Sequence, residues 1–152
     1  MSRRRMGHID LDTGEILEGG MPMLLQPKRR NGFDDGWLAM TQGSQLMTFV
    51  QSDLTLTDYR VFFTLLNHVE EGNLIRTPQS EMAEKVGIAR SNFNTSVARL
   101  IEEGVIEKGE KNGRTTTLKL CSQYGWKGSA KSHVADLSEY RKRKQKEVPP
   151  KL

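Results

Sequence analysis

Apolar residues at helical spacing after Thr57 constrain the fold more than any other feature of the chain. They recur three or four residues apart, as one face of a helix requires, at Tyr59, Phe62, Phe63, Leu66 and Val69. Thr57 and Asp58 suit the start of such a helix, and Glu71, Gly72 and Asn73 suit its end. We therefore expect a helix with one broad apolar face, followed by a short extended piece at residues 74–76.

A second helix is predicted to begin at Thr77 and Pro78. Thr77 suits the N-cap, and Pro78 suits the first helical position because its missing N–H has no partner there. The helix runs to about Val86 and turns three apolar residues inward, Met82, Ala83 and Val86. Gly87 then supplies a tight turn, and Ile88 an apolar plug between this helix and the next.

A third helix is expected over residues 89–103, with Gly104 ending it. Its buried side carries Phe93, Val97, Leu100 and Ile101. Residues 105–108, 109–113 and 114–120 then predict a strand, a loop and a strand. The order of elements predicts an α+β fold, a winged helix-turn-helix domain with an N-terminal β-hairpin extension and a basic C-terminal tail.

The polar side of the third helix has the composition of a surface that reads DNA. A helix-turn-helix places the start of its second helix in the major groove, where hydroxyl, amide and guanidinium groups reach base edges and phosphates. Ser91, Thr95, Ala98 and Arg99 share this side, flanked by Asn92 and Asn94, and Glu102 and Glu103 follow only beyond it. A solvated helix surface without function is the alternative interpretation.

The loop of the hairpin adds cations that would lie against the DNA backbone or minor groove. An ordinary soluble turn explains these charges nearly as well. The predicted DNA-binding residues are Thr77, Gln79, Arg90, Ser91, Asn92, Asn94, Thr95, Arg99, Lys108, Lys111, Asn112 and Arg114. The net charge of +4 lies entirely after residue 128, so the central module is neutral and the tail contributes no sequence specificity.

Three parts are expected along the chain. Residues 1–50 form a basic arm, a β-hairpin around Gly14 and a stretch at 37–50 that packs on the next domain as strand, short helix or both. Residues 51–129 form the winged helix-turn-helix domain. Residues 130–152 form a basic tail with a candidate helix at 134–146, which either embraces DNA or only solubilises the chain.

Signals for catalysis and cofactors are weak. His8, Asp10 and Asp12 alternate on one strand face but lack a second cluster of ligands, so we predict no metal site. There is no phosphate-binding glycine loop or paired-cysteine motif, and the lone Cys121 is expected to be buried. We predict no enzyme, no cofactor, no membrane partner and a cytoplasmic location.

Three segments together resemble the RepL-like plasmid replication proteins. They are residues 9–18 with the acidic-Thr13-Gly14-Glu15 hairpin, the helix leading into the turn, and the Trp126-Lys127-Gly128 element after the wing. The resemblance implies an initiator that binds origin DNA and recruits host replication proteins. Ala89 departs from the pattern because an N-cap there is commonly Ser, Thr or Asp, so Ser91 is an alternative cap.

Three functions remain open at this point. The first is sequence-specific binding of double-stranded DNA in plasmid replication initiation or copy-number control. A transcriptional regulator with the same fold is the second, and a winged-helix adaptor that binds protein is the third. Residues 8–50 are a candidate interface for a homodimer, although nothing in the sequence fixes the oligomeric state.

Overall fold

The computed structural model describes residues 8–9, 16–17 and 36–147. The chain divides into two units, residues 1–35 and 36–152, and each is described by itself. In the first unit, β1 (His8–Ile9) pairs antiparallel with β2 (Ile16–Leu17), with Ile9 opposite Ile16. This pairing agrees with the expected hairpin. Asp10 and Asp12 of the metal hypothesis lie outside the described residues.

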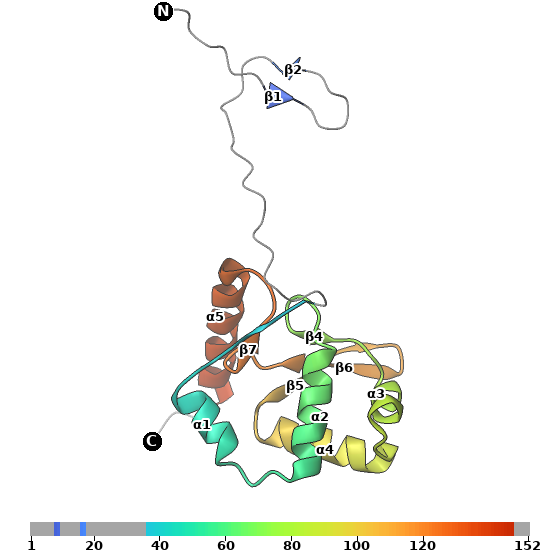
Figure 1. Cartoon of the computed structure of the whole chain (residues 1–152). Helices are drawn as coiled ribbons and strands as arrows, with labels where there is room; N and C mark the ends of the chain where they lie inside the picture. The colour runs from blue at the N-terminus through green and yellow to red at the C-terminus, as the bar shows by residue number, and fades with distance from the viewer. Residues whose placement is uncertain (1–7, 10–15, 18–35, 148–152) are drawn as a thin grey trace, which may run out of the picture. The chain divides into compact units, whose positions relative to one another are not determined.

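Within the described residues the second unit contains five helices and two small sheets (Figure 1). In chain order the elements are β3 (Ala39–Met40), α1 (Ser44–Val50), α2 (Leu56–Asn67), β4 (Leu74–Ile75), α3 (Gln79–Val86), α4 (Arg90–Glu102), β5 (Ile106–Asn112), β6 (Thr115–Leu120), β7 (Gly125–Trp126) and α5 (Ala130–Glu147). Strand β6 lies between β4 and β5 in an antiparallel sheet, and β3 pairs with β7. This is the expected winged helix-turn-helix fold, extended at both ends.

Helix α2 begins one residue earlier than Thr57, because Thr55 is its N-cap. The Thr55 hydroxyl accepts from the Asp58 backbone N–H, and the Asp58 carboxylate accepts from the Thr55 N–H. Val61, Phe62 and Leu65 form the buried face. Phe63, expected on that face, is instead 64% exposed, since the helix turns residues 58, 61, 62 and 65 inward.

The turn between α3 and α4 follows the prediction closely. Gly87 adopts φ 70°, a left-handed conformation that suits glycine, and Ile88 packs against the core. Pro78, rather than Thr77, is the residue before the first turn of α3. Ala89 precedes α4 without a side-chain cap, so Ser91 lies inside the helix and does not begin it.

The β5–β6 hairpin is longer than expected. Residues 109–112, predicted as loop, belong to β5, and only Gly113 and Arg114 separate the strands. Gly113 has φ 63°, as the first central residue of a tight primed turn requires. The pairing steps from Lys108 opposite Leu118 to Lys111 opposite Thr116, so β5 contains one extra residue, a β-bulge at Gly109 and Glu110.

Both flanking segments pack on the domain. Phe49 of α1 is buried, with its ring centroid 4.7 Å from that of Phe62 and 6.0 Å from that of Tyr124. Residues 36–50, expected in the N-terminal part, therefore belong to the same compact unit as the winged helix. Helix α5 contains the predicted helix and starts four residues earlier, at Ala130. In the described residues no helix is long and apolar enough to cross a membrane.

Candidate nucleic-acid interface

An ion pair fixes α4 against α2. The Asp58 carboxylate is fully buried, and Nη1 of Arg99 donates to its Oδ2 at 3.2 Å. Burial alone would raise the pKa of Asp58, but hydrogen bonding from Ser96, Thr55 and Arg99 outweighs it and holds that pKa below its ordinary value. The carboxylate is therefore charged at neutral pH. Arg99 is half exposed. One side of its guanidinium holds α4 against α2, and the other side faces solvent, where it can contact a ligand.

The outer face of α4 presents small polar side chains to solvent. Ser91, Asn92, Asn94 and Thr95 are all exposed, whereas Phe93 is fully buried between them. Within the described residues neither Asn92 nor Asn94 has a side-chain hydrogen-bond partner, so their amides are available to a ligand. The Thr95 hydroxyl donates to the Ser91 carbonyl at 2.9 Å and keeps its acceptor lone pairs.

The N-terminus of α4 is electrostatically uncompensated. No side chain caps it, and its first turn contains no acidic residue. The free N–H groups and the positive end of the helix dipole therefore face solvent, an arrangement that attracts phosphate. Arg90, the first helical residue, is exposed at the same place. The missing cap at Ala89 would destabilise an isolated helix, but it leaves N–H groups free to bind an anion.

The bulge in β5 places two lysines on one face of the wing. Paired residues of an antiparallel ladder point to the same side, and Thr116 and Leu118 are two residues apart. Lys111, opposite Thr116, therefore shares a face with Lys108, opposite Leu118. A regular strand would send residues three apart to opposite faces. This is the face that continues the buried Ile106–Leu120 pair, and both lysines are exposed on it.

The remaining predicted residues surround this surface. Arg114 is exposed in the hairpin turn, and Asn112 ends β5 beside it. Thr77 and Gln79, at the start of α3, are only partly exposed. In Figure 1, α3, the beginning of α4 and the tip of the β5–β6 hairpin lie on the same side of the domain. The predicted residues thus lie on three neighbouring elements.

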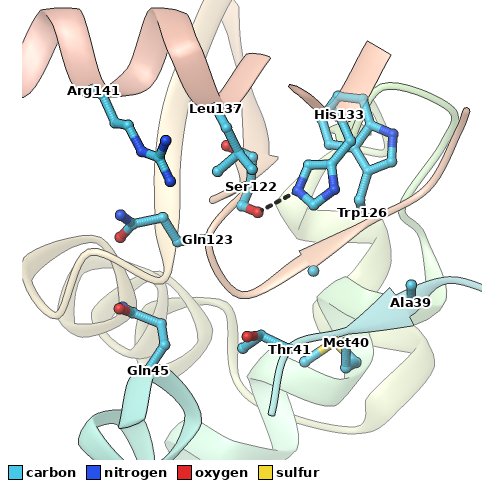
Figure 2. A pocket seen from close by; sticks show the side chains of 11 residues that line it. Ala39, Met40, Thr41, Gln45, Ser122, Gln123, Trp126, His133, Leu137 and Arg141 are labelled. Carbon is cyan, nitrogen blue, oxygen red and sulfur yellow. Dashed lines mark hydrogen bonds between the residues drawn. The ribbon is translucent and has the colours of Figure 1, made fainter. Parts of the chain in front are cut away.

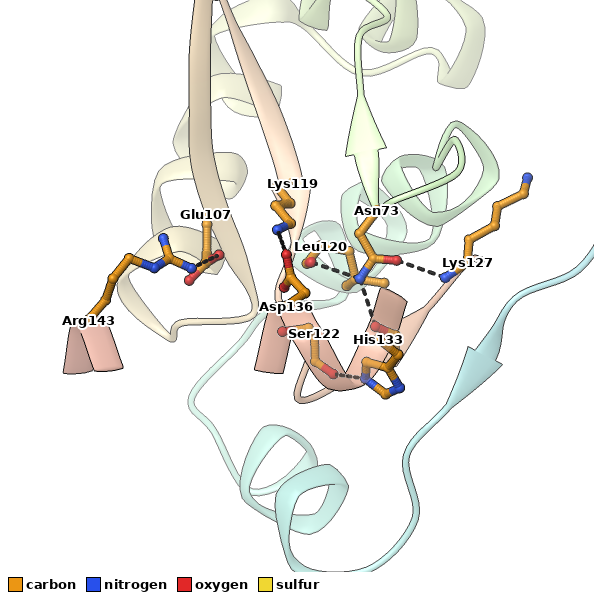
Figure 3. Close-up of polar contacts among 10 residues, drawn as sticks. Asn73, Glu107, Lys119, Leu120, Ser122, Lys127, His133, Asp136 and Arg143 are labelled. Carbon is orange, nitrogen blue, oxygen red and sulfur yellow. Dashed lines mark hydrogen bonds and ion pairs between the residues drawn. The ribbon is translucent and has the colours of Figure 1, made fainter. Parts of the chain in front are cut away.

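Helix α5 lies on the opposite face of the wing. Lys119 of β6 forms an ion pair with Asp136, and Arg143 lies 3.7 Å from Glu107 of β5 (Figure 3). Glu107 and Lys119 are opposite each other in the ladder, on the face away from the bulge lysines. Helix α5 is therefore a structural brace of the wing through Asp136 and Arg143, whereas Lys142 and Lys144 pair, among the described residues, only with glutamates of α5 itself.

A buried asparagine that sequence reasoning missed joins the strands behind the wing. Asn73 has φ 66°, and its Nδ2 donates to the carbonyl oxygens of Leu120 at 3.0 Å and Gly125 at 2.7 Å (Figure 3). Its Oδ1 accepts from the Lys127 N–H at 2.8 Å. An Asn after Gly at a helix end signals a left-handed turn, but its long-range partners carry no local signature. The pairing of Asp58 with Arg99 was also missed, although the Thr55-to-Asp58 spacing is that of a capping box.

Comparisons with known proteins support the fold. Residues 76–107 match a family model described as winged helix-turn-helix DNA-binding, a segment that contains α3, the turn, α4 and the start of β5. Over these residues the sequence therefore agrees with the winged helix-turn-helix fold of the structure. The match does not extend to the hairpin tip or to the flanking segments. Comparison of the sequence with curated proteins gives no match.

Solved structures with similarity to the chain are distant. The DNA-binding TubR fragment from Clostridium botulinum is 12% identical with a TM-score of 0.37, covering 59% of this chain and 99% of that one. RV1404 from Mycobacterium tuberculosis is 18% identical with a TM-score of 0.38, covering 70% and 68%. NMB1585, a MarR family regulator from Neisseria meningitidis, is 22% identical with a TM-score of 0.34, covering 62% and 60%.

Proposed function

We propose that this protein binds a specific sequence of double-stranded DNA, with α4 in the major groove and the wing along the backbone. The observation that supports this most is the outer face of α4, where Asn92 and Asn94 are exposed and without intramolecular partners. Amides in this state can each form two hydrogen bonds with an adenine edge. An inert surface on a neutral domain would more often use Glu and Lys, which solvate well.

The wing supplies the phosphate contacts in this proposal. Lys108, Lys111 and Arg114 form no ion pair within the described residues, so binding to DNA breaks no existing salt bridge. The uncapped start of α4 provides a further phosphate site. Because the central module carries no net charge, the placement of these few cations, rather than bulk attraction, must orient the protein on its site.

Selection from a random duplex library, followed by affinity measurements across a salt series, tests the proposal. We expect one enriched motif, and an affinity that falls steeply as salt rises because each neutralised phosphate releases counterions. Asn92→Ala should weaken binding to the motif by about tenfold to one hundredfold while leaving non-specific binding intact. Asn67→Ala, an exposed amide at the end of α2, is the matched control and should have no effect.

Absence of an enriched motif, or an affinity insensitive to salt, would contradict the proposal and favour the protein-binding adaptor. A winged helix that binds protein through this surface would not need phosphate contacts. The salt series therefore separates the two classes of function without knowledge of the partner.

As the biological role we propose transcriptional regulation. A regulator needs only the DNA-binding surface described above. The initiator implied by the RepL-like resemblance needs, in addition, a surface that recruits host replication proteins, and the resemblance alone supports it. A reporter placed behind the selected motif should respond to the protein under the first role. Under the second, a plasmid carrying the gene and its flanking DNA should replicate, and should fail when the gene is disrupted.

A further inference from the structure

A pocket lies on the side of the domain formed by the two flanking segments. It has a volume of about 320 Å³, and its walls come from β3, α1, the β6–β7 connection and α5 (Figure 2). None of the predicted DNA-binding residues lines it. Packing of the winged-helix core does not require a pocket between these segments, so the pocket calls for an explanation of its own.

The lining combines an apolar wall with one cation. Met40, Leu137 and Trp126 supply apolar surface, and the Trp126 ring is held by stacking on His133 at 5.1 Å between centroids. His133 is itself fixed, because its Nε2 lies 2.8 Å from the Ser122 carbonyl oxygen, which it can reach as a donor. A wall fixed in this way is preorganised for a flat apolar group.

The polar groups of the pocket lie around Arg141. Figure 2 shows the Arg141 guanidinium directed toward Gln123, with Gln45 across the pocket. Within the described residues Arg141 has no ion-pair partner, and none of the lining residues is acidic. The Ser122 hydroxyl is buried and has no hydrogen-bond partner in the described part of the chain. An unsatisfied buried hydroxyl is uncommon enough to suggest a polar partner supplied from outside.

We propose that this pocket binds a small organic carboxylate with an aromatic or similarly flat apolar body. The guanidinium binds the carboxylate through its planar pair of donors, and the body lies against Trp126 and Leu137. The single cation among neutral amides matches one negative charge. A phosphate dianion would ordinarily require more than one cation. The site is separate from the DNA-binding surface and is independent of the proposed function.

Phenylacetate is a suitable probe, titrated into the full-length chain to about 20 mM and followed by amide and indole NMR. The chain contains two tryptophans, so the Trp126 indole N–H, which donates to the Ser129 carbonyl, reports on the pocket. Trp37, 59% exposed, provides an internal reference. We expect a saturable shift of the Trp126 signal with a Kd of about 1 mM, and little change at Trp37.

Two comparisons test the role of the charge. Arg141→Gln should weaken binding at least about tenfold, whereas Lys142→Gln, which removes the neighbouring charge outside the pocket, should leave it within about twofold. Phenylacetamide, the neutral analogue, should bind the unaltered protein at least about tenfold more weakly, and this arm does not depend on the folding of any variant. No saturable shift at Trp126, or equal binding of the two ligands, overturns the proposal.

Discussion

Replacement of Asn73 by alanine should be among the most destabilising single changes outside the apolar core. The side chain forms three buried hydrogen bonds, to the Leu120 and Gly125 carbonyl oxygens and from the Lys127 N–H. Each partner left without a bond costs about 1 kcal/mol or more, so the three together cost about 3 kcal/mol. Alanine also tolerates φ 66° less well than asparagine, which adds about 1 kcal/mol. We therefore expect a loss of about 4 kcal/mol.

Asn73→Gly separates the two contributions. Glycine accepts the positive φ without strain but loses the same three hydrogen bonds, so the free energy of unfolding should fall by about 3 kcal/mol. Asn73→Asp keeps the shape and the bond to Lys127, but points a carboxylate oxygen at two carbonyl oxygens. This variant should therefore be less stable than the unaltered protein at neutral pH, and its stability should recover in part as the carboxylate is protonated.

Equilibrium unfolding in urea, monitored by circular dichroism and tryptophan fluorescence, measures all three variants. The expected losses are large against a total stability of about 5–15 kcal/mol, but should leave a folded population in the absence of denaturant. A loss of less than about 1.5 kcal/mol for Asn73→Ala, with an unchanged m-value, would mean that the hydrogen bonds of Asn73 contribute little to stability.

Three further changes test other parts of the structure. Asp58→Asn should lower the free energy of unfolding by about 2 kcal/mol at neutral pH. Because the folded-state pKa of Asp58 is depressed, the stabilisation from this carboxylate is present above the unfolded pKa of about 4 and is lost as pH falls through the folded pKa. The difference in free energy of unfolding between the unaltered protein and Asp58→Asn, measured in urea, should therefore shrink in acid. A difference that stays constant with pH would contradict a stabilising, charged Asp58. Gly109→Ala would bring a Cβ into a clash with the Thr117 hydroxyl, which donates to the Glu110 carbonyl, and should lower the free energy of unfolding by about 1–3 kcal/mol as measured by thermal unfolding. The same change at Gly72, where the space is open, is limited to its backbone strain. Lys111→Ala should reduce the slope of log affinity against log salt by about 1 for every DNA sequence, with Lys131→Ala as the control; a loss confined to one sequence would instead make Lys111 a base-reading residue.

The helices and their order could be predicted from the sequence because they depend on local patterns. Apolar spacing, Pro78 near a helix start and Gly87 in a left-handed turn are all encoded within a few residues. Phe63 was misplaced for the same reason, since the apolar spacing of α2 fits more than one choice of buried face. Only the packing of α4 and α1 decides that Val61 and Leu65 are buried while Phe63 is exposed.

The features that could not be predicted depend on residues far apart in the sequence. Asn73 bonds to groups 47 and 52 positions away, and Arg99 meets Asp58 across 41 positions. The bulge at Gly109 is set by the partner strand, so the length of β5 and the shared face of its lysines are invisible in β5 alone. The exposed residues of α4 were foreseen from helical periodicity, whereas their contacts with DNA remain a prediction.

The bulge also determines how the wing tolerates changes in its length. On one side of it the ladder is fixed by the buried Ile106–Leu120 pair, and on the other by the tight turn at Gly113 and Arg114. Deletion of Gly109 would leave both registers in place and convert the bulge into a regular ladder, with Lys108 and Lys111 still on the same side. One residue between the two lysines can thus be lost without reversing either side chain. Related sequences that lack one residue at this point would present the same charged surface.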